Sequence, residues 1–282
     1  MKKEEDKEMI KQAVTGAKPE EKDEDDIIEL VKAMAVAAVV ALLIRSFAFE
    51  PFNIPSGSLL PTLQIGDYLF VEKYAYGYSK YSFPLDLIDF KGRIFGAGPA
   101  RGDIAVFRQP KKTGIDYIKR IIGLPGDSIQ VKEGVLYING KLVMRDFRDA
   151  DFVTDDGHSS LYRRYIETLP NGVQHYIYEI SDNERFDNTP AYTVPPGAYF
   201  AMGDNRDSSM DSRAQDELGF IPAENLIGRA WFIFFSTEGV GNKCDKENGV
   251  SAIAAVASFG CKLIEWPKAV RYSRFFKNVN KI

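Results

Sequence analysis

Cysteine and histidine are scarce in this chain of 282 residues, which contains only two of each. Neither the cysteines, Cys244 and Cys261, nor the histidines, His158 and His175, form a cluster with metal-ligand spacing. A structural zinc site is therefore not expected, and the sequence indicates no metal and no organic cofactor. The two cysteines could form one disulfide in an oxidising compartment, a question that the sequence leaves open.

An excess of basic charge is also missing. Lys and Arg total 36 against 40 Asp and Glu, which gives a net charge of −4. A general nucleic-acid-binding protein would carry a basic excess, so no nucleic-acid partner is expected. With 45% hydrophobic and 12% aromatic residues, the chain can build a sizeable core in one large or two small domains.

Long apolar runs are few, and only residues 33–44 make a convincing membrane segment. This run is shorter than the roughly 20 residues that a helix needs to cross a bilayer. Extended to residues 27–49, with Lys32 and Arg45 reaching the interfaces, the segment approaches that length. The sequence favours a retained transmembrane anchor over residues 27–49; a cleavable signal peptide and a buried core helix are the alternatives.

The charges around this segment indicate its orientation. Residues 1–26 are charged and poor in large apolar groups, which is typical of a tail. Lys18, Lys22 and Lys32 precede the apolar run, whereas only Arg45 lies close after it. The positive-inside rule then predicts a cytoplasmic tail, with the rest of the chain on the outer side of the membrane.

The rest of the chain is rich in short β-branched and aromatic runs, which predict a mainly β fold. The expected strands cover residues 67–73, 103–109, 116–122, 128–132, 135–138, 141–144, 175–180, 198–202 and 226–235. Asn139-Gly140 lies between two of them and is typical of a type I′ hairpin turn.

These runs predict a large β-domain in two parts, residues 50–144 and 194–237. Residues 145–193 are charged and polar, with one clear strand, and we expect a smaller inserted β subdomain there. Residues 238–282 hold a C-terminal insertion, an apolar helix over residues 250–264 and a basic, aromatic tail that could contact anionic lipid.

Two serines, Ser56 and Ser58, flank a glycine directly after the apolar segment, in a stretch bounded by Pro55 and Pro61. Proline fixes φ and glycine tolerates unusual backbone angles, so residues 51–63 predict a shaped loop rather than a helix or an inner strand. A hydroxyl held on such a loop is a candidate nucleophile; an ordinary surface turn is the alternative.

A nucleophilic serine needs a base, and the sequence favours a lysine. We expect both histidines, His158 and His175, on the surface of the polar insert. Lys119 instead lies in an apolar strand, where a period of two places Tyr117 and Ile121 on the same face. Burial would lower the pKa of Lys119 and make it a general base. The alternative is a lysine at a sheet edge with its ammonium in water.

Residues 203–213 (GDNRDSSMDSR) form a third polar segment, after an expected strand. An EF-hand loop needs an oxygen ligand and a glycine where this segment has Arg206 and Ser209, so that calcium motif is not met. A loop that holds a buried lysine through hydroxyl and carboxylate contacts fits better.

Taken together, three motifs resemble those of the type I signal peptidases, membrane-anchored serine proteases with a Ser–Lys dyad. Residues 54–58 (IPSGS) resemble the nucleophile box, residues 117–120 (YIKR) the lysine box and residues 203–213 the third box. The similarity covers roughly residues 30–235 and the C-terminal end. It implies a mainly β, signal-peptidase-like catalytic domain with an inserted β subdomain on one transmembrane helix.

The resemblance implies a serine endopeptidase of a bacterial-type inner (plasma) membrane that removes N-terminal signal peptides from exported preproteins after small residues, in sites of the Ala-x-Ala type. Preprotein signal peptides and membrane lipid are the implied partners. Ser58 would be the nucleophile that forms the acyl-enzyme, and Lys119 the general base. The side chain of Ser56 and the backbone N–H of Ser58 would form the oxyanion hole.

The resemblance also implies supporting roles. Ser209 would orient the ammonium of Lys119, and Asp211 and Arg213 would pair to hold the active-site loop. Shallow pockets for small side chains would be lined by Phe52, Ile54, Pro55 and Ile118. Leu59 follows the nucleophile where the family commonly has methionine, a residue of similar size, and residues 238–263 look like an insertion.

Two other functions remain open. A non-catalytic, membrane-tethered β-protein could bind extended peptides, although the presence of Ser58 and Lys119 argues against it. Another Ser–Lys hydrolase, such as a self-cleaving repressor or a pilin-processing peptidase, would use the same chemistry. The repressor would carry a DNA-binding domain rather than an anchor, and the pilin-processing enzyme would differ in its substrate.

Overall fold

The computed structural model describes residues 22–83, 90–112, 114–155, 158–238 and 267–280. Most of the predicted N-terminal tail, the apolar segment 250–264 and both cysteines lie outside these residues, so the predictions about them stay predictions. The chain divides into two compact units, residues 1–44 and 45–282.

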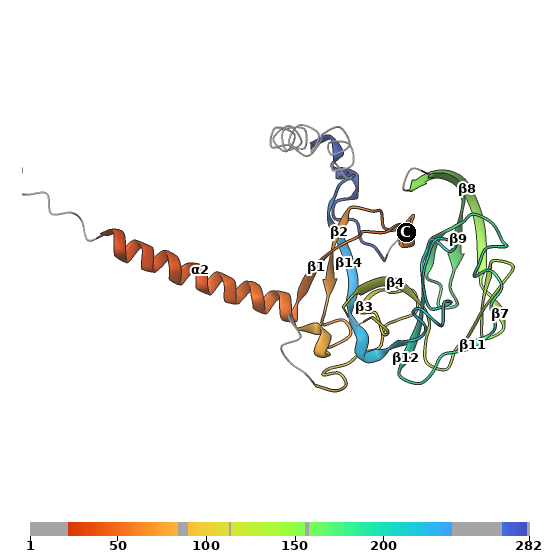
Figure 1. Cartoon of the computed structure of the whole chain (residues 1–282), viewed down its shortest axis with the longest axis horizontal. Coiled ribbons are helices and arrows are strands. Elements are labelled where there is room, and N and C mark those ends of the chain that lie inside the picture. The colour runs from red at the N-terminus through yellow and green to blue at the C-terminus, as the bar shows by residue number, and fades with distance from the viewer. Residues whose placement is uncertain (1–21, 84–89, 113, 156–157, 239–266, 281–282) are drawn as a thin grey trace, which may run out of the picture. The chain divides into compact units, whose positions relative to one another are not determined.

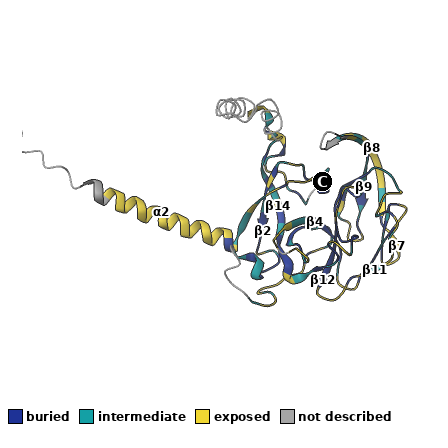
Figure 2. Cartoon of the chain, viewed as in Figure 1, coloured by how far each residue is buried: buried dark blue, intermediate teal, exposed yellow. Residues whose placement is uncertain are grey.

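The N-terminal helix α2 spans Lys22–Phe47, and no proline or glycine interrupts it. Among the described residues, its segment Asp26–Phe47 is long and apolar enough to cross a membrane, with a mean hydropathy of 2.5. The apolar side chains of this segment are exposed rather than packed into a core (Figure 2). The helix ends two residues before the predicted anchor boundary, because Phe49 begins the first strand.

The second unit is built on a seven-stranded antiparallel sheet with the order β1-β2-β14-β3-β4-β12-β13 (Figure 1). Its strands are β1 (Phe49–Asn53), β2 (Asp67–Glu72), β3 (Ile104–Arg108), β4 (Asp116–Gly123), β12 (Ala198–Met202), β13 (Ile221–Pro222) and β14 (Leu226–Ser236). The mainly β prediction is confirmed. The sequence did not predict β1, which tolerates Pro51 because it is an edge strand.

A four-stranded sheet adds β5 (Ser128–Lys132), β6 (Val135–Ile138), β7 (Lys141–Leu142) and β11 (Tyr192–Thr193), in the order β11-β5-β6-β7. The predicted hairpin joins β6 to β7. Its two loop residues, Asn139 and Gly140, have φ angles of 55° and 75°, the positive values that a type I′ turn requires at both positions.

A three-stranded sheet, β10-β9-β8, follows in the chain, with β8 (Met144–Asp155), β9 (His158–Thr168) and β10 (Gln174–Glu179). The sequence predicted one clear strand in this region, and the structure has three. Most described residues of β8 are exposed (Figure 2), so this strand lacks the alternation of apolar and polar residues that marks a half-buried strand.

A hydrophobic core lies beneath the segment that carries Ser58. Ile54 and Leu59, on either side of this serine, are 3% and 1% exposed and pack in a cluster with apolar residues of β2, β3 and β14. Complete burial of one such side chain contributes about 1.5–3 kcal/mol. The two anchors therefore fix the backbone between them.

Candidate active site

Ser58 lies in a single 3₁₀ turn, Gly57–Leu59, where the sequence predicted only a loop. The turn is closed by the N–H of Leu60, which donates to the carbonyl of Gly57 at 3.0 Å. Before the turn, the N–H of Ile54 donates to the carbonyl of Asp67 at 2.8 Å, and the carbonyl of Ile54 accepts from the N–H of Gly66 at 2.9 Å. Ser58 is only 8% exposed, so its hydroxyl is held in a fixed and largely dry position.

Lys119 lies on β4, opposite Ala105 of β3, and is 5% exposed. Its ammonium nitrogen Nζ donates to the Ser58 hydroxyl oxygen Oγ over 2.6 Å. The fold thus brings together two residues that are 61 positions apart in the sequence. Lys119 is buried as predicted, with its Nζ 5.5 Å from the ring centroid of Tyr117, and the alternative of an ammonium group in water is wrong.

Burial makes the neutral amine of Lys119 more accessible than that of an exposed lysine. Burial lowers the pKa of Lys119 from 10.5 to about 8, while the carboxylates of Asp211 and Asp204 act in the opposite direction. At pH 7, about one Lys119 in ten is then neutral, against about one in 3,000 for an unshifted lysine. The nitrogen that touches the serine hydroxyl can therefore accept its proton near neutral pH.

The loop of residues 203–213 is fixed to the serine turn. The backbone N–H of Asn205 donates to the carbonyl of Ser58 at 3.1 Å, and its side-chain amide donates to the carbonyl of Gly57 at 3.2 Å. A Cβ at Gly203 would lie 2.5 Å from the carbonyl oxygen of Ser58. Glycine is therefore required there, because the loop passes directly against the serine backbone.

Asp211 and Arg213 form the predicted pair. Two hydrogen bonds of 2.9 Å join the guanidinium of Arg213 to both oxygens of Asp211, and the N–H of Gly203 donates to the same carboxylate at 3.0 Å. Burial opposes ionisation, but Arg213 and these donors hold the pKa of Asp211 below its usual value. The pair closes residues 203–213 into a rigid loop.

Comparisons with known proteins agree on one family. A family model described as signal peptidase, peptidase S26, matches residues 27–235. Signal peptidase I of Rickettsia typhi (strain ATCC VR-144 / Wilmington) is 44% identical over 251 residues, which cover 86% of this chain and 90% of the relative. Signal peptidase I of Rickettsia conorii (strain ATCC VR-613 / Malish 7) is 44% identical over 255 residues, covering 88% and 91%. This chain belongs to the signal peptidase I family.

As a member of this family, the protein is a serine endopeptidase. A solved signal peptidase I from Enterococcus faecalis V583 also matches, at 28% identity, over 47% of this chain and 97% of its own. The TM-score of that match is 0.29, so the family assignment depends on the sequence matches.

The structure differs from the sequence prediction at Ser209. This residue is 5% exposed, but its Oγ has no hydrogen-bond partner among the described residues, so the expected bond to Lys119 is not formed. A Cβ at Gly203 would lie 2.3 Å from Ser209 Oγ, which shows that the hydroxyl packs against this glycine. In this structure, Ser209 fills space beside the dyad.

Ser56 lies just before the serine turn and is exposed. Its backbone is extended, with φ −133° and ψ 155°, and its hydroxyl does not cap the turn. Of the residues predicted to line substrate pockets, Pro55 is exposed, while Phe52 and Ile118 are half-buried against the core cluster. Ile54 belongs to that cluster and offers a ligand almost no surface.

Arg120, which neighbours Lys119 on β4, is buried and had no role predicted from the sequence. Its guanidinium forms two hydrogen bonds of 2.7 Å to the carboxylate of Asp204, which also accepts one of 2.6 Å from the hydroxyl of Thr62. These contacts join β4 to the loop of residues 203–213. Arg120 lies in the motif of residues 117–120 and Asp204 in that of residues 203–213. The signal that could have revealed the pair was a charged residue, Arg120, on a strand expected to be buried.

Arg206 of the same loop forms a second buried pair, with Glu167 of β9, through hydrogen bonds of 2.5 and 2.9 Å. The prediction that His175 lies on the surface is wrong, since this residue is 2% exposed. Burial and the positive charges of Arg120 and Arg206 hold the pKa of His175 well below its usual value. A buried His175 with such a low pKa is therefore a poor general base and does not replace Lys119 in that role.

Proposed function

We propose that this protein removes N-terminal signal peptides from exported preproteins, cleaving after small residues in Ala-x-Ala sites. The observation that carries the proposal is the 2.6 Å contact between Lys119 Nζ and Ser58 Oγ in a buried setting where the lysine pKa is about 8. A neutral amine in contact with a serine hydroxyl is the arrangement that a Ser–Lys hydrolase needs.

In the proposed reaction, Ser58 Oγ attacks the carbonyl carbon of the scissile peptide bond while Lys119 Nζ takes the hydroxyl proton. The resulting ammonium then gives this proton to the leaving amine, the C–N bond breaks, and an ester on Ser58 remains. A water molecule next attacks the ester and passes a proton to Lys119. That proton returns to Ser58 Oγ when the acid product leaves.

The tetrahedral intermediates need donors for their oxyanion. Ser58 is the second residue of the 3₁₀ turn, whose own hydrogen bond is donated by Leu60, so the turn does not use the N–H of Ser58. The exposed hydroxyl of Ser56 is the second proposed donor. One such donor typically contributes about 10²–10³ in rate.

The substrate would bind as an extended strand beside Ser58. Among the described strands, β1 has β2 as its one neighbour, and β12 pairs with β4 only from Arg120 onward. In the described sheet, the segment of β4 just before Lys119 therefore has a pairing edge without a strand. A peptide backbone can pair with such an edge, while Phe52, Pro55 and Ile118 contact its small side chains.

Helix α2 would be the membrane anchor, with the N-terminus in the cytoplasm and the β-domain on the outer side of a bacterial-type inner membrane. The charges around the helix support this orientation, since lysines precede the apolar run. A catalytic unit that begins directly after the anchor suits a signal peptide that is itself held in lipid.

Cleavage of a purified preprotein with an Ala-x-Ala site, by the full chain in non-ionic detergent, tests the proposal. We expect one cut after the last alanine, no cut by Ser58→Ala, and a normal cut by the control Ser128→Ala. Cleavage by Ser58→Ala would contradict the assigned nucleophile. No cleavage by the folded wild-type protein with lipid added would contradict the proposed substrate and favour a peptide-binding role.

A further inference from the structure

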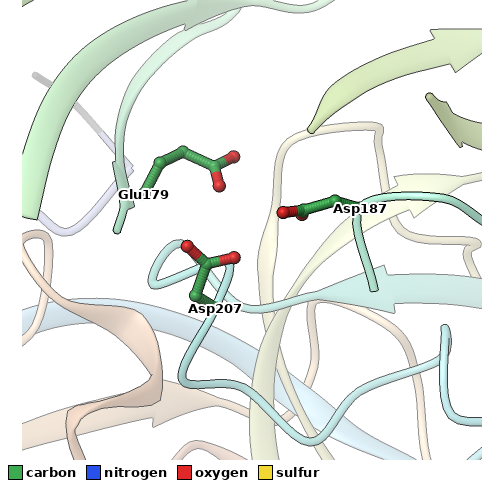
Figure 3. A group of neighbouring side chains, drawn as sticks. All are labelled: Glu179, Asp187 and Asp207. Carbon is green, nitrogen blue, oxygen red and sulfur yellow. The ribbon is translucent and has the colours of Figure 1, made fainter. Parts of the chain in front are cut away.

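Three carboxylates outside the dyad point toward one another. Glu179 ends β10, Asp187 lies in the following segment, and Asp207 belongs to the loop of residues 203–213. One carboxylate oxygen from each lies within 4.8 Å of the other two. Figure 3 shows the three side chains converging on a common space from three separate parts of the chain.

Each of these carboxylates has one buried oxygen with no hydrogen-bond partner among the described residues: Glu179 Oε2, Asp187 Oδ1 and Asp207 Oδ1. The second oxygens are used, since Asp187 Oδ2 and Asp207 Oδ2 each accept a backbone N–H at 2.6 Å. Glu179 and Asp187 are both 1% exposed. Buried polar atoms are almost always paired, so three convergent unpaired oxygens point to a missing partner.

Neighbouring arginines compensate this charge only in part. Arg206 and Arg213 already form the bidentate pairs described above. Arg145 forms an ion pair of 2.9 Å with Asp182 and a longer one of 3.5 Å with Glu179. Burial, together with the nearby carboxylates, raises the pKa of Glu179 well above its usual value. Among the described residues, Arg145 is the one ion-pair partner of these three carboxylates, so ionisation of all three would leave a buried excess of negative charge.

We propose that Glu179, Asp187 and Asp207 bind one divalent cation, of which calcium fits best. All the ligands are hard carboxylate oxygens, which calcium and magnesium prefer over softer metals. Ca–O distances of about 2.3–2.6 Å allow opposite ligands to lie roughly 4.6–5.2 Å apart, whereas Mg–O distances of about 2.1 Å allow only about 4.2 Å. The observed spacing of up to 4.8 Å thus suits calcium, with water completing the coordination.

Such an ion would fasten the three-stranded sheet to the loop of residues 203–213, which carries Asp211. This site differs from the EF-hand motif, which the sequence of that loop does not match. Only one of the three ligands, Asp207, comes from it. Because the others come from residues 179 and 187, sequence spacing gave no signal for this site.

The test uses the full chain in non-ionic detergent. Bound divalent cations are first removed from the protein with a chelator, and the chelator is then removed. Thermal melting is followed while calcium chloride or magnesium chloride is added, and equilibrium dialysis with radioactive calcium gives the stoichiometry. We expect one calcium per chain and a Tm increase of about 5–10 °C at a hundredfold excess over Kd. The matched control, Glu184→Gln, changes an exposed carboxylate three positions from Asp187 and should respond like the wild type.

Asp187→Asn should bind calcium at least tenfold more weakly and lose the Tm increase. If that variant does not fold, Glu179→Gln provides the same comparison. Two results would overturn the proposal. In the first, no cation binds at millimolar concentration and Glu179→Gln is more stable than the wild type, which would show that the carboxylates share a proton instead. Tighter binding of magnesium than of calcium would overturn the assignment of the ion.

Discussion

The pH dependence of kcat/KM tests the assignment of Lys119 as general base. Only the neutral amine can take a proton from Ser58, so the rate should follow the neutral fraction of a group with a pKa of about 8. That fraction rises from about 1% at pH 6 to about 90% at pH 9. We therefore expect a roughly 90-fold increase over this range, followed by a plateau.

Other bases would give different curves. A lysine with its ordinary pKa of 10.5 would produce an increase of about 10³-fold between pH 6 and 9 with no plateau. A histidine with an ordinary pKa of about 6.5 would produce an increase of only about fourfold, complete near pH 7.5. The three possibilities differ by more than tenfold, which is well outside the error of a rate measurement.

The assay follows cleavage of a peptide with an Ala-x-Ala site at substrate concentrations below KM, in non-ionic detergent, with a stability check at each pH. Lys119→Arg should be inactive throughout, because a guanidinium stays charged at every pH used. The control Lys132→Arg changes an exposed lysine of β5 and should keep the wild-type curve. A midpoint near pH 6.5, or cleavage by Lys119→Arg, would refute the reasoning.

Three further predictions concern stability and rate. Lys119→Met should abolish cleavage yet raise Tm at pH 7 by about 4–8 °C. The variant removes the cost of burying an ammonium, about 3 kcal/mol, and loses the hydrogen bond to Ser58, which contributes only ~1 kcal/mol. Between pH 8 and 10.5, Lys119 is protonated in the unfolded chain but mostly neutral in the folded one. The wild type should therefore become more stable as the pH rises through that window, and the variant should not. Ser56→Ala should lower kcat about 10²–10³-fold with little change in KM, and an unchanged kcat would remove Ser56 from the oxyanion hole. Arg206→Leu should lower the free energy of unfolding by about 3–5 kcal/mol in denaturant melts, because it leaves Glu167 buried without a counter-charge. The double variant with Glu167→Leu should lose less, and an equal loss would contradict this reasoning.

The sequence predicted those parts of the molecule whose physics is local. The strands of the large sheet alternate or are continuously apolar, because at least one of their faces is buried, and the Asn139-Gly140 turn needs only its own backbone angles. Lys119 could be selected because a charged residue with Tyr117 and Ile121 on its face is unusual in a buried strand. Each of these inferences used at most ten consecutive residues.

The missed features depend on contacts between distant residues. Arg206 meets Glu167 across 39 positions and Arg120 meets Asp204 across 84, and no local pattern encodes either pair. The error at Ser209 has a related cause, because a motif gives the residue type but not the direction in which the hydroxyl points. His175 was misplaced because the surrounding sequence is polar, whereas its neighbours in space bury it.

These distant contacts share one consequence, which concerns the three-stranded sheet of β8, β9 and β10. Tyr178 of β10 exchanges backbone hydrogen bonds of 2.9 Å with Asp204 and Arg206, and β9 supplies Glu167 to the same loop. Removing the insert would leave the guanidinium of Arg206 buried without a counter-charge and would free one side of the loop that rests on the carbonyl of Ser58. The sheet is separate in its strand pairing, but the position of the dyad depends on it. We therefore expect that the three-stranded sheet cannot be removed without loss of activity.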